Sequence, residues 1–125
     1  MAKPAREYLG GLVHYLVKAF DFNSSGQFEI GTLPAGATMV KPVSGVSINT
    51  AFNAATTNTF DIGTSANATL YASALAAGSV AFVPLDEVVS QTVASATTLY
   101  GRYNQSGTAA TAGAGVAIVA YVLAS

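Results

Sequence analysis

The residue in this chain that comes closest to a catalytic group is Asp61, within the stretch TNTFDIGTSA at residues 57–66. A carboxylate followed by glycine and hydroxyl-bearing residues is typical of aspartic proteases and of the phosphate-binding turns of actin-like ATPases. The proteases share a proton between two carboxylates that neighbouring hydroxyl groups hold in place. Here the next residue is Ile62, which has no hydrogen-bonding side chain. An ATPase of that kind needs two lobes, and 125 residues are too few to form them.

We therefore predict a structural role for this stretch. Phe60 and Ile62 should share one face of a strand, which places Asp61 on the opposite face, pointing outward. Gly63 should begin a turn that Thr64 and Ser65 cap. On this interpretation Asp61 is not a catalytic residue.

The other groups that could bind a metal ion or transfer a proton are scattered along the chain. His14 is the only histidine and there is no cysteine, so the ligands of a zinc site and the histidine-centred triad of a hydrolase are missing. Asp86 and Glu87 are adjacent; on a strand they would point to opposite faces, and in a loop they could hold a cation only weakly. The sequence predicts no catalytic, metal or cofactor site. His14 should lie at the surface or an interface, and the acidic pair in a solvated loop.

Tyr100, Arg102 and Tyr103 could form a stacking platform for a glycan or for single-stranded nucleic acid. The net charge of −1 argues against nucleic acid, because nothing in the composition supplies a basic surface. A glycan site remains compatible with these three residues but is not specifically indicated by them.

The N-terminal residues 1–11 concentrate charge in an otherwise neutral chain and contain a proline that favours extended backbone. This pattern predicts an extended arm that contacts a partner; the alternative is a solvated tail. The residues that would contact the partner are Lys3, Pro4, Arg6, Glu7 and Tyr8.

The composition is poor in charge throughout. Asp, Glu, Lys and Arg make up 9% of the chain, against about 25% in an ordinary soluble domain. Hydrophobic residues make up 51%, and Thr, Ser, Asn and Gly fill much of the remainder. Much of the exterior must therefore be neutral and easily desolvated, which favours burial against neighbouring subunits. The alternative is a monomer that Thr, Ser and Asn keep in solution.

Two basic residues precede an apolar run within residues 1–20, as in a signal peptide. Gly10, Gly11 and His14 interrupt that run and no small-residue cleavage site follows it, so we expect the chain to stay in the cytoplasm where it is made. The absence of cysteine fits a reducing compartment. No apolar stretch approaches the length of a membrane-spanning helix, so we expect no membrane partner.

From residue 12 onward the chain reads as short strands separated by turns. Residues 12–22 alternate and are rich in β-branched and aromatic residues, which favours a strand over the helix that their spacing also permits. Pro42 should place the strand at 37–48 on an edge or divide it in two with a bulge. The apolar run at 116–123 should be a central strand buried on both faces, and residues 70–75 could form a helical turn. Further strands are expected at 27–30, 59–62, 80–83 and 97–103.

About eight short strands with turns rich in Gly, Pro and Asn predict an all-β fold, an antiparallel β-sandwich. A chain of 125 residues has room for one core. We therefore expect a single domain over 12–125 behind an extended N-terminal arm at 1–11.

Several segments together resemble the small structural proteins of tailed bacteriophages. Their jelly-roll domains serve as capsid decoration, or cement, proteins, and related modules occur in head and tail fibres. The resemblance covers nearly the whole chain after the arm, although Pro42 breaks a strand and Ser-Ala-Asn-Ala follows Asp61 where an acidic residue would be expected. The segments are VKAFDF (17–22), FEIGTLPAGATMV (28–40), TAFNAATTNTFDIGTSA (50–66), YASAL (71–75) and QSGTAATAGAGVAIVAYV (105–122).

The resemblance implies a non-enzymatic jelly-roll protein without a cofactor, located on the outer capsid surface of the virion after assembly in the bacterial cytoplasm. Its partners would be the major capsid protein, whose neighbouring subunits it bridges, and further copies of itself. A homotrimer is the favoured assembly and a homodimer is possible. The alternative is a head or tail fibre, or an adsorption module that binds a host-surface glycan.

Overall fold

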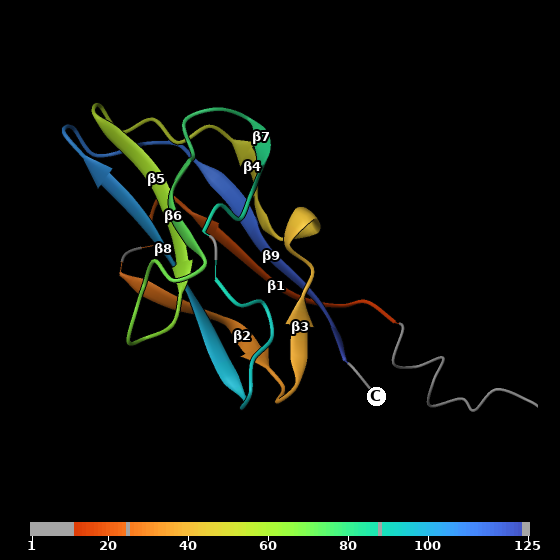
Figure 1. Ribbon diagram of the computed structural model, residues 1–125. Helices are drawn as coiled ribbons and strands as arrows, with labels where there is room; N and C mark the ends of the chain where they lie inside the picture. The colour runs from red at the N-terminus through yellow and green to blue at the C-terminus, as the bar shows by residue number, and fades with distance from the viewer. Residues whose placement is uncertain (1–11, 25, 88, 124–125) are drawn as a thin grey trace, which may run out of the picture.

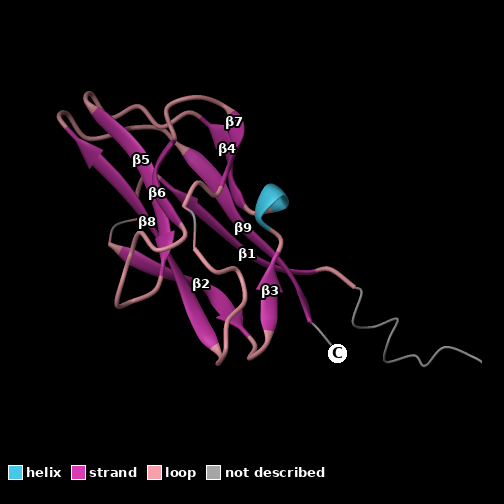
Figure 2. Cartoon of the chain, in the orientation of Figure 1, coloured by secondary structure: helices cyan, strands magenta, loops and turns pink. Residues whose placement is uncertain are grey.

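The computed structural model describes residues 12–24, 26–87 and 89–123. Within these residues nine strands form two antiparallel sheets, which pack against each other as a β-sandwich (Figure 1). One short 3-10 turn, η1, Lys41–Val43, is the only helical element in the described part of the chain (Figure 2). The strands are β1 His14–Asp21, β2 Gln27–Leu33, β3 Ala37–Met39, β4 Gly45–Thr50, β5 Thr57–Gly63, β6 Ala72–Ala76, β7 Ala81–Pro84, β8 Thr97–Ser106 and β9 Ala114–Leu123. The predicted all-β antiparallel sandwich is confirmed.

The two sheets interleave strands from distant parts of the chain. The first sheet has the order β1-β9-β4-β7, with β3 also paired to β9, and the second has the order β2-β8-β5-β6. Every pair of neighbouring strands is antiparallel. The last strand, β9, therefore lies in the centre of its sheet, between β1 on one side and β3 and β4 on the other.

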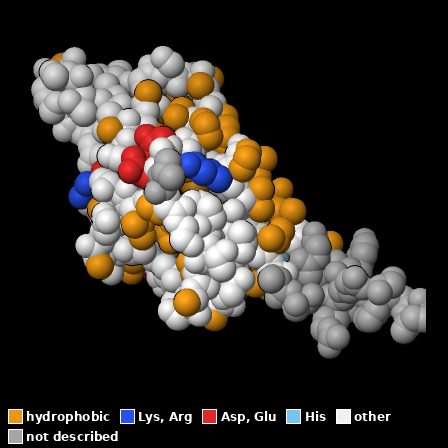
Figure 3. All heavy atoms as spheres, viewed as in Figure 1, with side chains coloured by type: hydrophobic (Ala, Val, Ile, Leu, Met, Phe, Trp, Pro, Cys, Tyr) orange, Lys and Arg blue, Asp and Glu red, His pale blue; other side chains and the backbone are white. Residues whose placement is uncertain are grey.

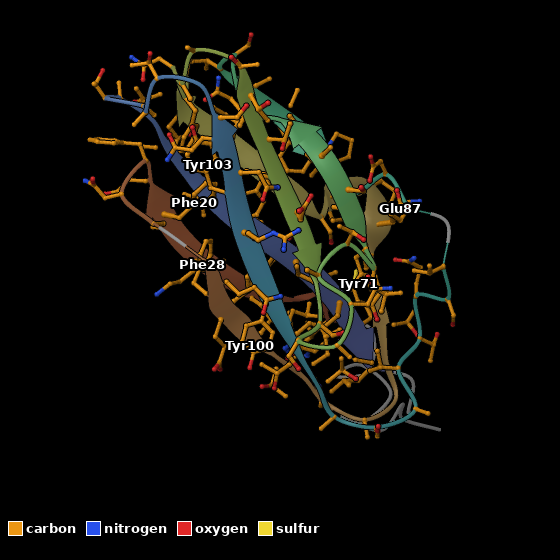
Figure 4. All side chains as sticks on the ribbon, turned by 90° about the vertical axis from the view of Figure 1, so that its left-hand side faces the viewer. Phe20, Phe28, Tyr71, Glu87, Tyr100 and Tyr103 are labelled. Atoms are coloured by element: carbon orange, nitrogen blue, oxygen red, sulfur yellow. The ribbon has the colours of Figure 1, made fainter. Side chains whose placement is uncertain are left out.

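Aromatic side chains fill the space between the sheets. Phe20 from β1 stacks on Phe60 from β5, with ring centroids 4.3 Å apart, and also contacts Phe28 and Phe52 (Figure 4). Each fully buried ring of this kind contributes roughly 1.5–3 kcal/mol through its removal from water. Gly101 of β8 allows this packing, because a Cβ there would lie 2.6 Å from Cζ of Phe60.

Two sequence-based predictions are wrong. Residues 70–75 do not form a helical turn, since β6 pairs with β5 and places Leu75 opposite Phe60; pairing within the sheet outweighs the local spacing. Residues 116–123 are central but not buried on both faces. Val116 and Ile118 remain partly exposed, because the second sheet covers only one side of β9.

The segment around Pro42 is divided, as expected for a proline that cannot donate to a ladder. The break is a 3-10 turn between β3 and β4, with Pro42 in its first turn, and no bulge forms there. β4 is not an edge strand, since it pairs with both β7 and β9. Within the described residues no helix is both long enough and apolar enough to span a bilayer.

Candidate functional site

Asp61 lies on the face of β5 opposite Phe60 and Ile62, but it does not point into solvent. Its side chain is 5% exposed. Oδ1 accepts a hydrogen bond from the backbone N–H of Ala74 at 2.8 Å, and Oδ2 accepts from Nη2 of Arg102 and Nδ2 of Asn104, each at 2.8 Å. Asp61 therefore lies on the outward face of the strand, as predicted, but that face is not open to solvent at this position: neighbours on β6 and β8 cover the carboxylate.

These neighbours also determine the protonation of the Asp61 carboxyl group. Burial raises the pKa of Asp61, but the hydrogen bonds from Ala74, Asn104 and Arg102, together with the charge of Arg102, outweigh that effect and leave the pKa below its ordinary value. A carboxylate held by several donors is a poor proton acceptor. Asp61 therefore has the environment of a structural anion.

The contact between Ala74 and Asp61 depends on an irregularity in β6. Ala74 has a φ of 57°, which is uncommon for a residue other than glycine. The register between β5 and β6 shifts between Phe60 and Ile62, which brings the Ala74 N–H to the carboxylate. Nothing in the sequence YASAL indicates this bulge, so sequence reasoning could not find the main-chain partner of Asp61.

The other candidate groups do not converge on a site. His14 stacks on Tyr121 of β9 with ring centroids 5.3 Å apart and is partly exposed. Asp86 accepts a 3.0 Å hydrogen bond from the backbone N–H of Ser73, and the carbonyl oxygen of Glu87 accepts one from Lys41 at 2.7 Å. The acidic pair thus lies in the predicted loop, where it helps to hold that loop against β6 and η1. In the described residues no group of three or more His, Asp or Glu side chains could hold a metal ion.

The stacking platform considered for Tyr100, Arg102 and Tyr103 does not form, because the three residues are divided between two faces of β8. Tyr103 is 5% exposed, packs on Phe52, and donates a 2.6 Å hydrogen bond to Oδ1 of Asn58 (Figure 4). Burial also raises the pKa of Tyr103. Tyr100 and Arg102 lie on the opposite, outer face, so only one tyrosine of the proposed platform remains there.

Exposed hydrophobic side chains lie on the outer face of the β1-β9-β4-β7 sheet, which we call the apolar face. Along β1 it carries Tyr15 and Val17, each 58% exposed, and along β7 it carries Phe82, 43% exposed. Val116 and Ile118 of β9 lie between β1 and β7. Ile118 pairs with Val17 of β1, and Val116 pairs with Ser47 of β4, which pairs in turn with Phe82 of β7. Hydrophobic side chains gather along the right-hand side of Figure 3, where Figure 1 draws β7, β4 and η1.

The apolar face is nearly free of charge. Among the paired positions of this face in the described strands, the one Asp, Glu, Lys or Arg side chain is Asp21, at the far end of β1. An exposed neutral sheet face is easily desolvated and is typical of a surface that contacts another protein. The composition predicted neutral surfaces, but their position on β1, β9 and β7 follows from the strand pairing. The predicted contact residues Lys3, Pro4, Arg6, Glu7 and Tyr8 lie outside the described residues.

A chain from the capsid asymmetric unit of cyanophage Pam1 has a similar structure. The TM-score is 0.63 at 23% sequence identity, and the match covers 90% of this chain and 84% of that chain. This likeness shows a shared fold. No protein-family model and no curated protein sequence matches the chain.

Proposed function

We propose that this chain is a non-enzymatic structural protein of a virion, which decorates the outer capsid shell and bridges subunits of the major capsid protein. The observation that carries the proposal is the shared fold with a chain of the Pam1 capsid asymmetric unit, over 90% of this chain. Fold alone does not determine function, so the proposal also depends on the surfaces of this molecule.

The apolar face gives this proposal its physical mechanism. Tyr15, Val17 and Phe82 present wide neutral contacts that lose little solvation when they dock on another protein. Weak contacts of this kind, repeated over the many equivalent positions of a symmetric shell, give strong overall attachment without a single high-affinity site. A decoration protein requires no more chemistry than this.

The connectivity supports the jelly-roll part of the proposal. The sheet orders β1-β9-β4-β7 and β2-β8-β5-β6 place early and late strands side by side in both sheets, as in a double-sheet jelly roll built from two Greek keys. The arm residues Lys3, Pro4, Arg6, Glu7 and Tyr8 are proposed as a tether onto the shell. Their charges would act alongside the neutral apolar face.

Co-sedimentation with capsid shells tests this function. Shells assembled from the major capsid protein of the same virus are mixed with the purified protein and pelleted. We expect saturable binding at a fixed ratio to the major capsid protein, and binding that persists at about 0.5 M salt, because a neutral face is little affected by screening. A chain that stays in the supernatant at every ratio contradicts the proposal.

A glycan-binding adsorption module is the alternative function. The three residues considered for such a site do not lie together. Tyr103 lies in the core, so that only Tyr100 and Arg102 of the three are on the outer face of β8. Reproducible binding to one sugar on a glycan array, lost in Tyr100→Ala, would favour this function over decoration of the shell.

A further inference from the structure

The edge of the first sheet formed by β1 differs from the other strand edges of the molecule. β1 is eight residues long, pairs with β9 in unbroken register, and has no second partner strand among the described residues. The other edges are protected by devices known to prevent pairing between molecules. β7 is four residues long and ends in Pro84, β3 has three residues, and the registers of β2 and β6 are interrupted by bulges.

The free main-chain groups of β1 can be assigned from the hydrogen-bond pattern. The N–H of Phe22 donates to the carbonyl oxygen of Gly113 at 3.1 Å, directly beyond the pair Asp21–Ala114. In an antiparallel ladder, hydrogen-bonded and non-hydrogen-bonded pairs alternate. The even-numbered residues of β1 therefore bond to β9, and the odd-numbered residues direct N–H and C=O away from it. Asp21 is already bonded within the turn that follows, because its N–H donates to Oγ of Ser24 and its carbonyl oxygen accepts from the N–H of Ser24. The odd-numbered residues that direct their main-chain groups to the open edge are therefore Tyr15, Val17 and Ala19.

The same odd-numbered residues carry the exposed apolar side chains. Tyr15 and Val17 are each 58% exposed, and Ala19 is exposed as well. One strand thus combines unpaired backbone donors and acceptors with uncovered hydrophobic side chains. A second β-strand that lies alongside would satisfy the backbone groups and cover the side chains together.

We propose that β1 pairs antiparallel with β1 of a second copy of this chain, across a two-fold axis perpendicular to the sheet. Such an axis keeps each side chain on its own side of the sheet, so residues opposite each other must both be odd-numbered or both even-numbered. The two β1-β9-β4-β7 sheets then become one, and the two apolar faces become a single neutral surface. Because the same strand supplies both partners, the contact is isologous and closes as a dimer.

Lys18 determines the register of this pair. It is exposed and is the one charged side chain within β1 before Asp21 at its end. The two registers that preserve most of the strand are centred on Val17 and on Lys18. Centring on Lys18 would bring two ammonium groups directly opposite each other, which is unfavourable. Centring on Val17 places Lys18 opposite Leu16 of the second copy, so the proposed register sets Val17 opposite its own symmetry mate.

The proposed dimer is modest in size. Pairing of two edge strands buries less than about 1,200 Å² in total, the range of weak or transient complexes. We therefore expect a dissociation constant in the micromolar range and a concentration-dependent equilibrium in solution. The dimer requires no capsid, so it stands or fails separately from the proposed function.

A single-cysteine variant tests the contact and its register, because the chain contains no cysteine of its own. Residues opposite each other in a hydrogen-bonded pair have Cα atoms about 5.5 Å apart, within the range of a disulfide. Val17→Cys should form a covalent dimer under mild oxidation at micromolar concentration. Phe82→Cys, on the same face but on β7, is the matched control and should remain monomeric. Equal cross-linking of both variants, or none by Val17→Cys, overturns the proposal.

Val17→Pro tests the pairing without introducing a cysteine. Proline removes the N–H that points away from β9 and leaves the β1–β9 hydrogen bonds intact. In sedimentation velocity the wild-type chain should shift from monomer to dimer with concentration. Val17→Pro should stay monomeric with an unchanged circular dichroism spectrum, whereas Val17→Thr, which keeps the N–H, should still dimerise. A wild-type monomer at about 100 μM, a trimer, or a Val17→Pro dimer overturns the proposal; if Val17→Pro does not fold, the cysteine pair decides.

Discussion

Nη2 of Arg102 lies 2.8 Å from Oδ2 of Asp61, across the β5–β8 pair in which these two residues are directly opposite. Asn104 and the backbone of Ala74 supply further hydrogen bonds to the same carboxylate. Asp61, whose sequence neighbours most resemble those of a catalytic aspartate, is thus a structural residue of the second sheet. Its role is to join β5, β6 and β8.

Asp61→Asn should destabilise the fold. The amide has the shape of the carboxylate, but in either orientation its NH₂ group faces a donor, either the Ala74 N–H or the side chains of Arg102 and Asn104. We expect a loss of about 2 kcal/mol in unfolding free energy in urea. Water moderates the loss, because the side chain of Arg102 is 39% exposed. Asp86→Asn, which removes a charge from an exposed loop residue, is the control and should change stability by less than about 0.5 kcal/mol.

Stability should also depend on pH through Asp61. Burial raises the pKa of this group, but the hydrogen bonds and the charge of Arg102 outweigh burial and hold the pKa in the folded protein below the unfolded value of about 3.9. The carboxylate therefore stabilises the fold above pH 4, and this contribution disappears as the pH falls through the folded-state pKa. Urea unfolding between pH 6 and pH 2 should show a smaller decrease for Asp61→Asn than for the wild type. Parallel curves would show that Asp61 is not linked to folding.

Gly101→Ala should destabilise the core. The new Cβ would lie 2.6 Å from Cζ of Phe60 and 3.0 Å from Cζ of Phe28, so both rings would have to move. Overpacking of this kind costs about 1–3 kcal/mol, measurable by thermal or urea unfolding. Gly78→Ala is the matched control, since a Cβ there meets nothing within 4 Å. Equal stability of the two variants would mean that the aromatic cluster has room to adjust.

Tyr103→Phe and Tyr100→Phe should separate a core tyrosine from a surface tyrosine. Tyr103 loses its 2.6 Å hydrogen bond to Asn58, and we expect a loss of about 1 kcal/mol in unfolding free energy. Tyr100 lies on the outer face, and its change should stay within about 0.5 kcal/mol. A larger effect at Tyr100 would contradict the assignment of these residues to opposite faces of β8.

The sequence predicted the sandwich and most of its strands because alternating polarity and turn residues are local signals. The pairing between strands that are distant in the sequence could be predicted less well. The spacing of apolar residues at 70–75 permits a helical turn, and only the pairing of β6 with β5 shows that a strand forms there. The covering of Asp61 requires a bulge at Ala74 with a positive φ, and an alanine in the sequence does not predict that conformation. The neutral composition indicated an apolar exterior, but only the register between β1 and β9 places Val17 beside Ile118 on one face.

The most direct test of the proposed function is a pair of particle reconstructions, with and without the gene for this chain. The proposal predicts a β-sandwich density on the outer surface of the shell at symmetry-equivalent positions, in contact with neighbouring major capsid subunits and absent from the deletion particles. Identical shells in both reconstructions, or a density confined to the tail, would contradict it.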